Sequence, residues 1–265
     1  MTELNAKITG EGPGIVLLHG FCEDLTLWDE LQQLLEHSYQ VIAIDLPGFG
    51  KSDPMPGSFT LTDIASVVHR YLNAQNISNY SVLGHSLGGY IALEMKALFP
   101  PEVQLFGLIH STALTDSEDK KQNRNKAIEF IRHHGVKVFL GEFVKGLFDN
   151  RFVERNKEAI AKVEAMGSNL TSATVIAYIE AMRDRNSHLD MLQSYPEQCL
   201  FLYGKDDNLF TAKDIESQTS IIPGSNVAEL DNVAHMGMYE DFYNFQSHIF
   251  EFLDTENSNL NPKTN

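Results

Sequence analysis

The residues best suited to chemistry in this sequence surround a serine in the hexapeptide "GHSLGG", residues 84–89. Ser86 has Gly84 two residues before it and Gly88 two residues after it, between a short apolar run that predicts a strand and a stretch with helical spacing. At such a turn the strand and the helix approach too closely for a Cβ atom on either side, so glycines are needed. The motif therefore predicts that Ser86 is presented at a sharp turn as a nucleophile.

A serine hydroxyl is a poor nucleophile unless a base removes its proton, so the motif requires a histidine oriented by a carboxylate. Of the ten histidines, His235 is the candidate, because "DNVAHMGMYE" places it between the last predicted strand and the last predicted helix. A parallel sheet presents such loops at the carboxyl edge of its strands. The sequence thus predicts His235 as the general base.

Three aspartates are candidates for the carboxylate that orients this histidine. Asp206 and Asp207 directly follow the predicted strand "CLFLYG" at residues 199–204, and Asp116 follows the predicted strand at residues 104–111. All three give the chain order serine, aspartate, histidine that is expected for a serine at a strand-to-helix turn. The residues alone leave the choice open, with Asp116 the weakest candidate.

The elements that must position these residues follow an α/β pattern, in which short runs rich in Val, Ile and Leu alternate with helical stretches. The runs predict strands at residues 15–20, 40–45, 80–84, 104–111, 199–204 and 226–231, with a further edge strand near residues 5–9. Residues 116–195 contain only helical segments, which predict an inserted helical cap. The predicted architecture is a mostly parallel central sheet flanked by helices, with a core at residues 1–115 and 196–255 and a flexible tail at residues 256–265.

The composition indicates a soluble globular protein and argues against several classes of partner. The 265 residues include 36 acidic and 20 basic side chains, so the net charge of -16 repels nucleic acid, anionic lipid and highly anionic substrates. Neither a signal peptide nor a membrane span is recognisable, which predicts a cytoplasmic protein with no membrane partner. The two cysteines, Cys22 and Cys199, lack the spacing of a metal site, so free thiols and no metal are expected.

Five segments resemble the α/β-hydrolase superfamily, in its capped serine esterase and lactonase branch: "IVLLHGF", "DLPGFGKS", "GHSLGG", "GKDD" and "NVAHMGMYE". The resemblance implies an α/β-hydrolase fold and an oxyanion hole formed by the backbone N–H groups of Phe21 and Leu87. It also favours Asp207 as the acid, because this aspartate lies three residues after Gly204, and keeps Asp206 as the alternative. Two such N–H donors are worth several kcal/mol of barrier.

Together these features predict a serine hydrolase that cleaves carboxylic esters, lactones or thioesters of small apolar substrates through an acyl-enzyme, without a metal or organic cofactor. Phe139, Phe143 and Leu147 in the cap lie on an apolar surface that either packs internally or lines the substrate pocket. The alternatives are a ligand-binding receptor of the same fold with little turnover and a hydrolase of C–C bonds. The acyl and alcohol groups and the oligomeric state are not defined by the sequence.

Overall fold

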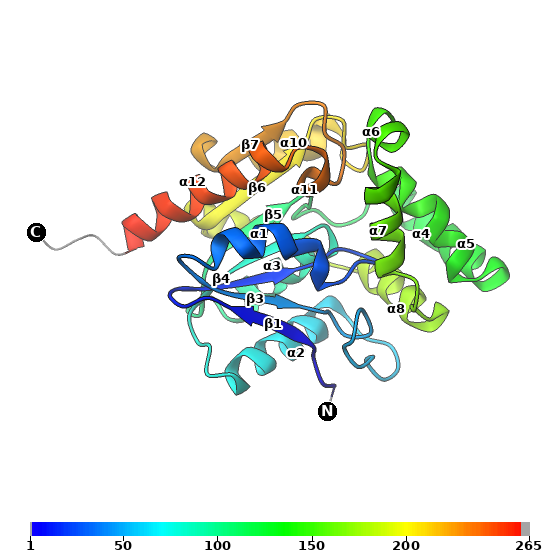
Figure 1. The fold of residues 1–265 in the computed structure, drawn as a ribbon, viewed down its shortest axis with the longest axis horizontal. Coiled ribbons are helices and arrows are strands. Elements are labelled where there is room, and N and C mark those ends of the chain that lie inside the picture. The colour runs from blue at the N-terminus through cyan, green and yellow to red at the C-terminus, as the bar shows by residue number, and fades with distance from the viewer. Residues whose placement is uncertain (1, 261–265) are drawn as a thin grey trace, which may run out of the picture.

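The computed structural model describes residues 2–260, and the side chains of residues 2–254. Seven strands form one sheet in the order β1-β3-β2-β4-β5-β6-β7 (Figure 1). The strands are β1 (Ala6–Thr9), β2 (Gly14–Leu18), β3 (Gln40–Ile44), β4 (Tyr80–His85), β5 (Val103–Ile109), β6 (Cys199–Gly204) and β7 (Val227–Leu230). Strand β1 is antiparallel to β3, and the other neighbouring pairs are parallel. All the strands expected from the sequence are present.

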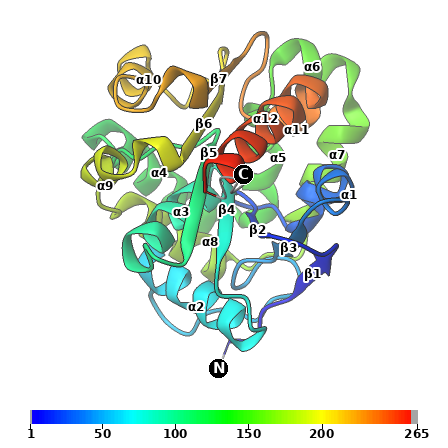
Figure 2. The same ribbon diagram turned by 90° about the vertical axis from the view of Figure 1, so that its left-hand side faces the viewer.

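Helices cover both faces of the sheet, as Figures 1 and 2 show. One face is covered by α1 (Asp29–Leu35) and α12 (Phe242–Leu260), and the other by α2 (Leu61–Ala74) and α3 (Leu87–Leu98). Side chains alternate along a strand, so Val16 and Leu18 of β2 pack into one core while Ile15 and Leu17 pack into the other. Burial on both faces explains why the strands read as continuous apolar runs.

A series of helices is inserted between β5 and β6, and all but the last of them gather at one end of the molecule (Figure 1). The helices are α4 (Glu118–His134), α5 (Val136–Phe143), α6 (Asn150–Arg155), α7 (Lys157–Met166), α8 (Ser172–Arg183) and α9 (Leu189–Ser194). The Ser117 side chain caps the start of α4, and Gly135 ends that helix with a φ of 81°. All these helices fall inside the segment in which the sequence shows no strand.

The remaining elements are short, and α12 is longer than the sequence suggested. The short elements are α10 (Ala212–Thr219), α11 (Gly237–Glu240) and the 3-10 turns η1 (Leu25–Trp28), η2 (Lys145–Leu147), η3 (Pro196–Gln198) and η4 (Gly224–Asn226). Helix α12 continues to Leu260, and the rest of the expected tail, residues 261–265, lies outside the described residues. Within residues 2–260, no helix has the length and apolar character needed to cross a bilayer.

Candidate active site

Ser86 lies at a strained turn between β4 and α3. Its φ of 49° and ψ of -110° are outside the regions that L-residues ordinarily adopt. A Cβ atom at Gly84 would collide with the backbone of Gly88, and one at Gly88 would collide with the Leu18 carbonyl of β2. The Ser111 hydroxyl donates a 2.7 Å hydrogen bond to the Ser86 carbonyl and so helps to hold the turn. The glycines therefore have the steric role that the sequence predicted for them.

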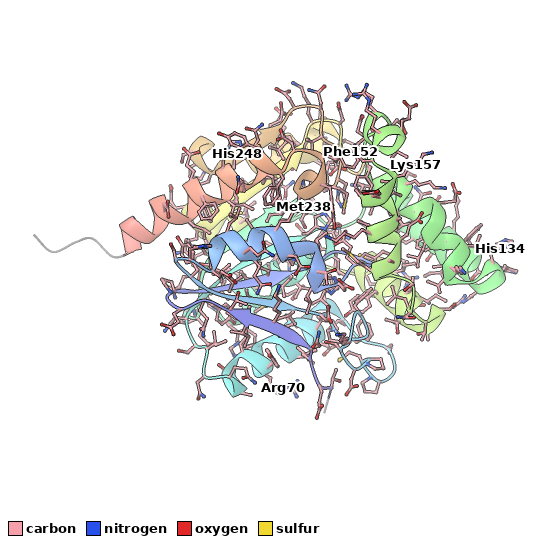
Figure 3. All side chains as sticks on the ribbon, viewed as in Figure 1. Arg70, His134, Phe152, Lys157, Met238 and His248 are labelled. Atoms are coloured by element: carbon pink, nitrogen blue, oxygen red, sulfur yellow. The ribbon has the colours of Figure 1, made fainter. Side chains whose placement is uncertain are left out.

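His235 reaches the same place from the loop after β7. Its Nδ1 lies 2.6 Å from Oδ2 of Asp207, and its Nε2 is buried with no hydrogen-bond partner among the described residues. Both His235 and Ser86 line one cavity. Two other histidines labelled in Figure 3, His134 and His248, do not line it. The ring of His235 thus has Nδ1 held by a carboxylate, while Nε2 has no hydrogen-bond partner among the described residues and the ring lines the same cavity as Ser86.

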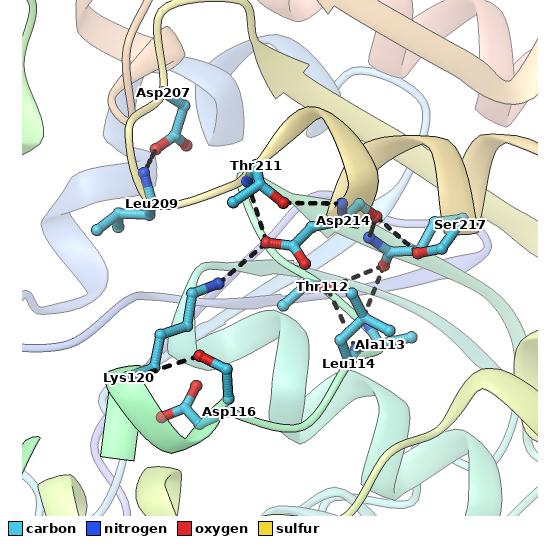
Figure 4. A network of polar contacts seen from close by, with 12 residues as sticks. Thr112, Ala113, Leu114, Asp116, Lys120, Asp207, Leu209, Thr211, Asp214 and Ser217 are labelled. Carbon is cyan, nitrogen blue, oxygen red and sulfur yellow. Dashed lines mark hydrogen bonds and ion pairs between the residues drawn. The ribbon is translucent and has the colours of Figure 1, made fainter. Parts of the chain in front are cut away.

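The three candidate carboxylates have separate surroundings. Asp207 is buried against His235, and its Oδ1 accepts a 3.0 Å hydrogen bond from the Leu209 N–H (Figure 4). Asp206 is exposed and pairs with Arg151 at 3.0 Å. Asp116 is buried in ion pairs with two arginines of the cap and its junction, described below. Of the three, the structure brings Asp207 to His235.

A second buried histidine, His110, adjoins the Asp207 carboxylate and was not singled out from the sequence. Its Nε2 accepts a hydrogen bond from the Gly237 N–H, so the ring proton is on Nδ1, which lies 3.6 Å from Asp207 Oδ2. Burial lowers the pKa of His110 to about 4 and keeps the ring neutral. Burial alone would raise the pKa of Asp207, but His235 and His110 lower it well below the usual range, so Asp207 is ionised.

His110, Asp207 and His235 are also the one group of described residues whose donor atoms lie close enough to hold a metal ion, within 4.8 Å of one another. The hydrogen bonds argue against that use. Nδ1 of His110 carries a proton because Nε2 is an acceptor, and Nδ1 of His235 donates to the carboxylate. The two rings therefore direct N–H groups, rather than lone pairs, at Asp207.

A buried ion pair lies behind the site and connects three of its segments. Glu23 Oε2 accepts hydrogen bonds from the Gly20 N–H at 2.6 Å and from His85 Nδ1 at 2.9 Å, and His85 Nε2 donates to the His235 carbonyl at 2.9 Å. Both nitrogens of His85 face acceptors, so the ring is an imidazolium. Burial alone would lower the pKa of His85, but the Glu23 carboxylate raises it above its ordinary value. The loop after β2, the serine turn and the His235 loop are thereby tied together.

The two backbone N–H groups assigned to an oxyanion hole are both available. Leu87 is the first residue of α3, so its N–H has no acceptor within the helix. Phe21 follows β2 in a loop where Cys22 has a φ of 66°. In the chain from residue 2 to residue 260, neither N–H donates a hydrogen bond to another protein group. Phe21 also lines the cavity that contains Ser86.

The cavity beside Ser86 has a volume of about 470 Å³, within the range of small-ligand sites. Phe139, Phe143 and Leu147 of the cap line it, and the Phe143 ring packs edge-on against Phe21 at 5.5 Å between centroids. These three side chains therefore line the cavity and also pack with the hydrophobic clusters of the protein. Charged side chains of α4 line the same cavity and were not identified from the sequence, because a polar helix face also occurs on solvent-exposed helices.

Proteins that are similar to this chain include esterases. A thermophilic esterase from Thermogutta terrifontis, solved with bound malate, superposes with a TM-score of 0.88 at 26% identity, covering 96% of this chain and 94% of that one. A pimeloyl-[acyl-carrier protein] methyl ester esterase from Pseudoalteromonas atlantica is 30% identical over 63% of this chain and 59% of its own length.

Another curated match is shorter. An uncharacterized protein of Mycobacterium tuberculosis is 32% identical over 41% of this chain, and the match spans 32% of that protein's own length. The sequence profile of the alpha/beta hydrolase fold, in contrast, matches residues 13–242, which is most of the chain. The chain belongs to the α/β-hydrolase family.

Proposed function

We propose that the protein hydrolyses carboxylic esters of small molecules, with Ser86, His235 and Asp207 as a catalytic triad. The observation that supports this most directly is the ring of His235, which lines the same cavity as Ser86. Its Nδ1 lies 2.6 Å from Asp207 Oδ2, and its Nε2 has no hydrogen-bond partner within residues 2–260. A general base needs this arrangement, because the carboxylate fixes the tautomer and the second nitrogen accepts the proton. The similarity to two esterases agrees with the reaction type.

The proposed reaction has two steps that return every proton. Ser86 Oγ attacks the ester carbonyl while His235 Nε2 takes its proton, and the imidazolium then protonates the leaving alcohol as the acyl-enzyme forms. In the second step His235 takes a proton from water as it attacks the acyl-enzyme, and then returns that proton to Ser86 Oγ as the acid leaves. In both steps the N–H groups of Phe21 and Leu87 would stabilise the oxyanion, and Asp207 would stabilise the imidazolium. Lactones fit the same scheme, since their carbonyl reacts identically.

Labelling with a fluorophosphonate tests the proposal together with hydrolysis of p-nitrophenyl esters from acetate to decanoate. We expect the wild-type protein to be labelled at Ser86 and to turn over short esters. The Ser86→Ala variant should lose both properties while its circular dichroism spectrum is unchanged. A Ser117→Ala variant, which alters a serine outside the cavity, should keep labelling and turnover and serves as the control. Labelling or full turnover in Ser86→Ala would exclude Ser86 as the nucleophile.

A further inference from the structure

The charge of the cavity is opposite in sign to that of the chain. Four charged side chains line the cavity: Lys120, Arg124 and Arg185 are cationic, and Asp116 is anionic. The chain as a whole has 36 acidic and only 20 basic residues. A low-dielectric cavity lined by an excess of one sign concentrates ligands of the other sign. The cationic excess therefore distinguishes this cavity from the rest of the protein and bears on which substrates can enter it.

Two of the three cations are already engaged by the protein. Arg185 is buried, and its Nη1 donates to Asp116 Oδ1 and to the Met182 carbonyl, each at 2.7 Å, while Nη2 donates to the Leu114 carbonyl at 2.9 Å. Arg185 thus closes the junction between core and cap. Lys120 reaches from α4 to Asp214, where the ion pair measures 3.2 Å (Figure 4). Arg185 keeps only its buried Nε–H without a hydrogen-bond partner among the described residues, and the Lys120 ammonium is already paired with a carboxylate.

Arg124 differs, because only one side of its guanidinium is used. Nε donates to Asp116 Oδ2 at 2.8 Å, and neither Nη group has a hydrogen-bond acceptor among the residues that the structure describes. The side chain is 24% exposed, on the wall of the cavity. Asp116 has each of its oxygens bound to one arginine, so a single carboxylate faces two guanidinium groups. One positive charge remains unbalanced, with its donors unoccupied.

We propose that the two Nη groups of Arg124 bind a free carboxylate on the substrate, so that the enzyme prefers esters bearing one remote carboxylate. This inference rests on the proposed ester hydrolysis for its reaction. A guanidinium matches the two oxygens of a carboxylate with parallel N–H donors. A single residual charge suits a monoanion better than a phosphate dianion.

The rest of the cavity suits the uncharged part of such a substrate. Phe139, Phe143, Ile179 and Met182 line it with apolar surface, which suits a methylene chain. In this low-dielectric setting a hydrogen-bonded charge pair is stronger than it would be in water. Ser86 and Arg124 on the wall of one cavity would thus hold the two ends of one small molecule.

Initial rates on matched esters test the preference and the side on which the carboxylate lies. For the acyl side, monomethyl adipate is compared with methyl hexanoate, and for the alcohol side, 4-acetoxybutanoate is compared with butyl acetate. We expect kcat/KM to be about tenfold or more higher for the anionic member of at least one pair, the factor typical of one charge-assisted hydrogen bond. Equal or lower values for the anionic member of both pairs would overturn the carboxylate site but leave ester hydrolysis standing.

Variants of α4 test whether Arg124 is the residue responsible for the preference for anionic esters. Arg124→Gln should lower the ratio of anionic to neutral kcat/KM at least tenfold, and Arg124→Lys should lower it less, because the charge is kept and the planar fork is lost. Arg132→Gln removes an exposed arginine of the same helix, 53% exposed and paired with Glu129, and should leave the ratio unchanged. An unchanged ratio in a folded Arg124→Gln protein would refute the assignment.

Binding gives a readout that does not depend on turnover. Isothermal titration of the Ser86→Ala protein with monomethyl adipate and 4-acetoxybutanoate should show binding of at least one of them that weakens about tenfold when Arg124→Gln is added. If no ester is hydrolysed by the wild-type protein but this Arg124-dependent binding is found, the carboxylate site stands and the hydrolase proposal fails. Binding that Arg124→Gln does not change, or no binding of either anion, would overturn the site.

Discussion

Replacing Glu23 by Gln is expected to destabilise the protein by about 3 kcal/mol, although the change keeps the shape of the side chain. One oxygen of Glu23 accepts both the Gly20 N–H and the His85 Nδ1 proton, and both partners are buried. A glutamine oxygen can occupy that position, but its NH₂ group then lies where Glu23 Oε1 has no hydrogen-bond partner among the described residues. A buried unsatisfied donor costs about 1–3 kcal/mol, and the charge of His85 is left without its counterion.

The loss of the counterion also affects the site. Without Glu23, His85 loses a proton near neutral pH, and a neutral ring has one N–H for two acceptors. It must then give up its bond either to residue 23 or to the His235 carbonyl. The loop of Gly20 and the loop of His235 would lose their common attachment. We therefore expect kcat/KM for a p-nitrophenyl ester to fall by about tenfold, the effect of a small misplacement of reacting groups.

Urea unfolding followed by circular dichroism, combined with the ester assay, measures both effects. Glu30→Gln is the matched control, because Glu30 is exposed and lies on α1 close in sequence. It should change the free energy of unfolding by less than about 0.5 kcal/mol. If Glu23→Gln destabilises the protein by less than about 1 kcal/mol and retains full kcat/KM, the ion pair does not hold these segments together and the reasoning is wrong.

Two pKa shifts predict how the difference in free energy of unfolding between the wild-type protein and Glu23→Gln depends on pH. Burial alone would raise the pKa of Glu23, but His85 lowers it below 4.5, so its contribution is present above pH 4.5 and lost as pH falls through the folded pKa. The pKa of His85 is raised above 6.5 in the folded protein, so its contribution is present below pH 6.5 and lost as pH rises through the folded value. The gap in stability between wild type and Glu23→Gln should be largest between about pH 4.5 and 6.5.

Two further predictions concern single side chains. Asp207→Asn should lower kcat by about 10⁴-fold, as the equivalent change does in a serine-protease triad. Asp206→Asn removes an exposed ion pair with Arg151 and should change kcat by less than about twofold. Steady-state kinetics on one ester compares the two variants, and an equal loss of kcat in both would refute the assignment of Asp207. Lys96→Met should lower the free energy of unfolding by about 2 kcal/mol in urea titrations, because the buried Nζ of Lys96 donates hydrogen bonds to the Pro100 and Val103 carbonyls. An unchanged free energy of unfolding would show that these carbonyls find other donors.

The sequence predicted the parts of the fold and the site that depend on local pattern. The turn that holds Ser86 could be predicted because its glycines, the strand before it and the helix after it are neighbours in the chain. His235 and Asp207 could be proposed because each follows a predicted strand, and parallel strands bring their carboxyl ends to one edge. The choice between Asp206 and Asp207 needed more, since adjacent residues in a turn point in different directions and only the structure shows which one meets the ring.

Contacts between distant segments could not be predicted in this way. Glu23 and His85 are 62 residues apart, and Asp116 and Arg185 are 69 apart, so nothing in either segment indicates its partner. A histidine before the serine and a glutamate in a polar loop have the same appearance whether they are buried together or exposed separately. His110 gave a weak signal, because it directly follows β5 at the same edge of the sheet as the serine.

The acidic net charge of the chain predicted that highly anionic substrates are disfavoured, and the cationic wall of the cavity limits that prediction. An acidic protein repels highly anionic ligands at long range, but charges more than about 8 Å from a ligand are largely screened at physiological salt. Once a monoanion is inside the cavity, the nearest charged groups act on it directly, and those on the wall are mainly cationic. Total charge therefore bears on how fast an anion arrives, while Arg124 and its neighbours bear on how tightly it is held. A carboxylate-bearing ester that associates slowly and binds strongly is compatible with both the acidic net charge of the chain and the cationic wall of the cavity.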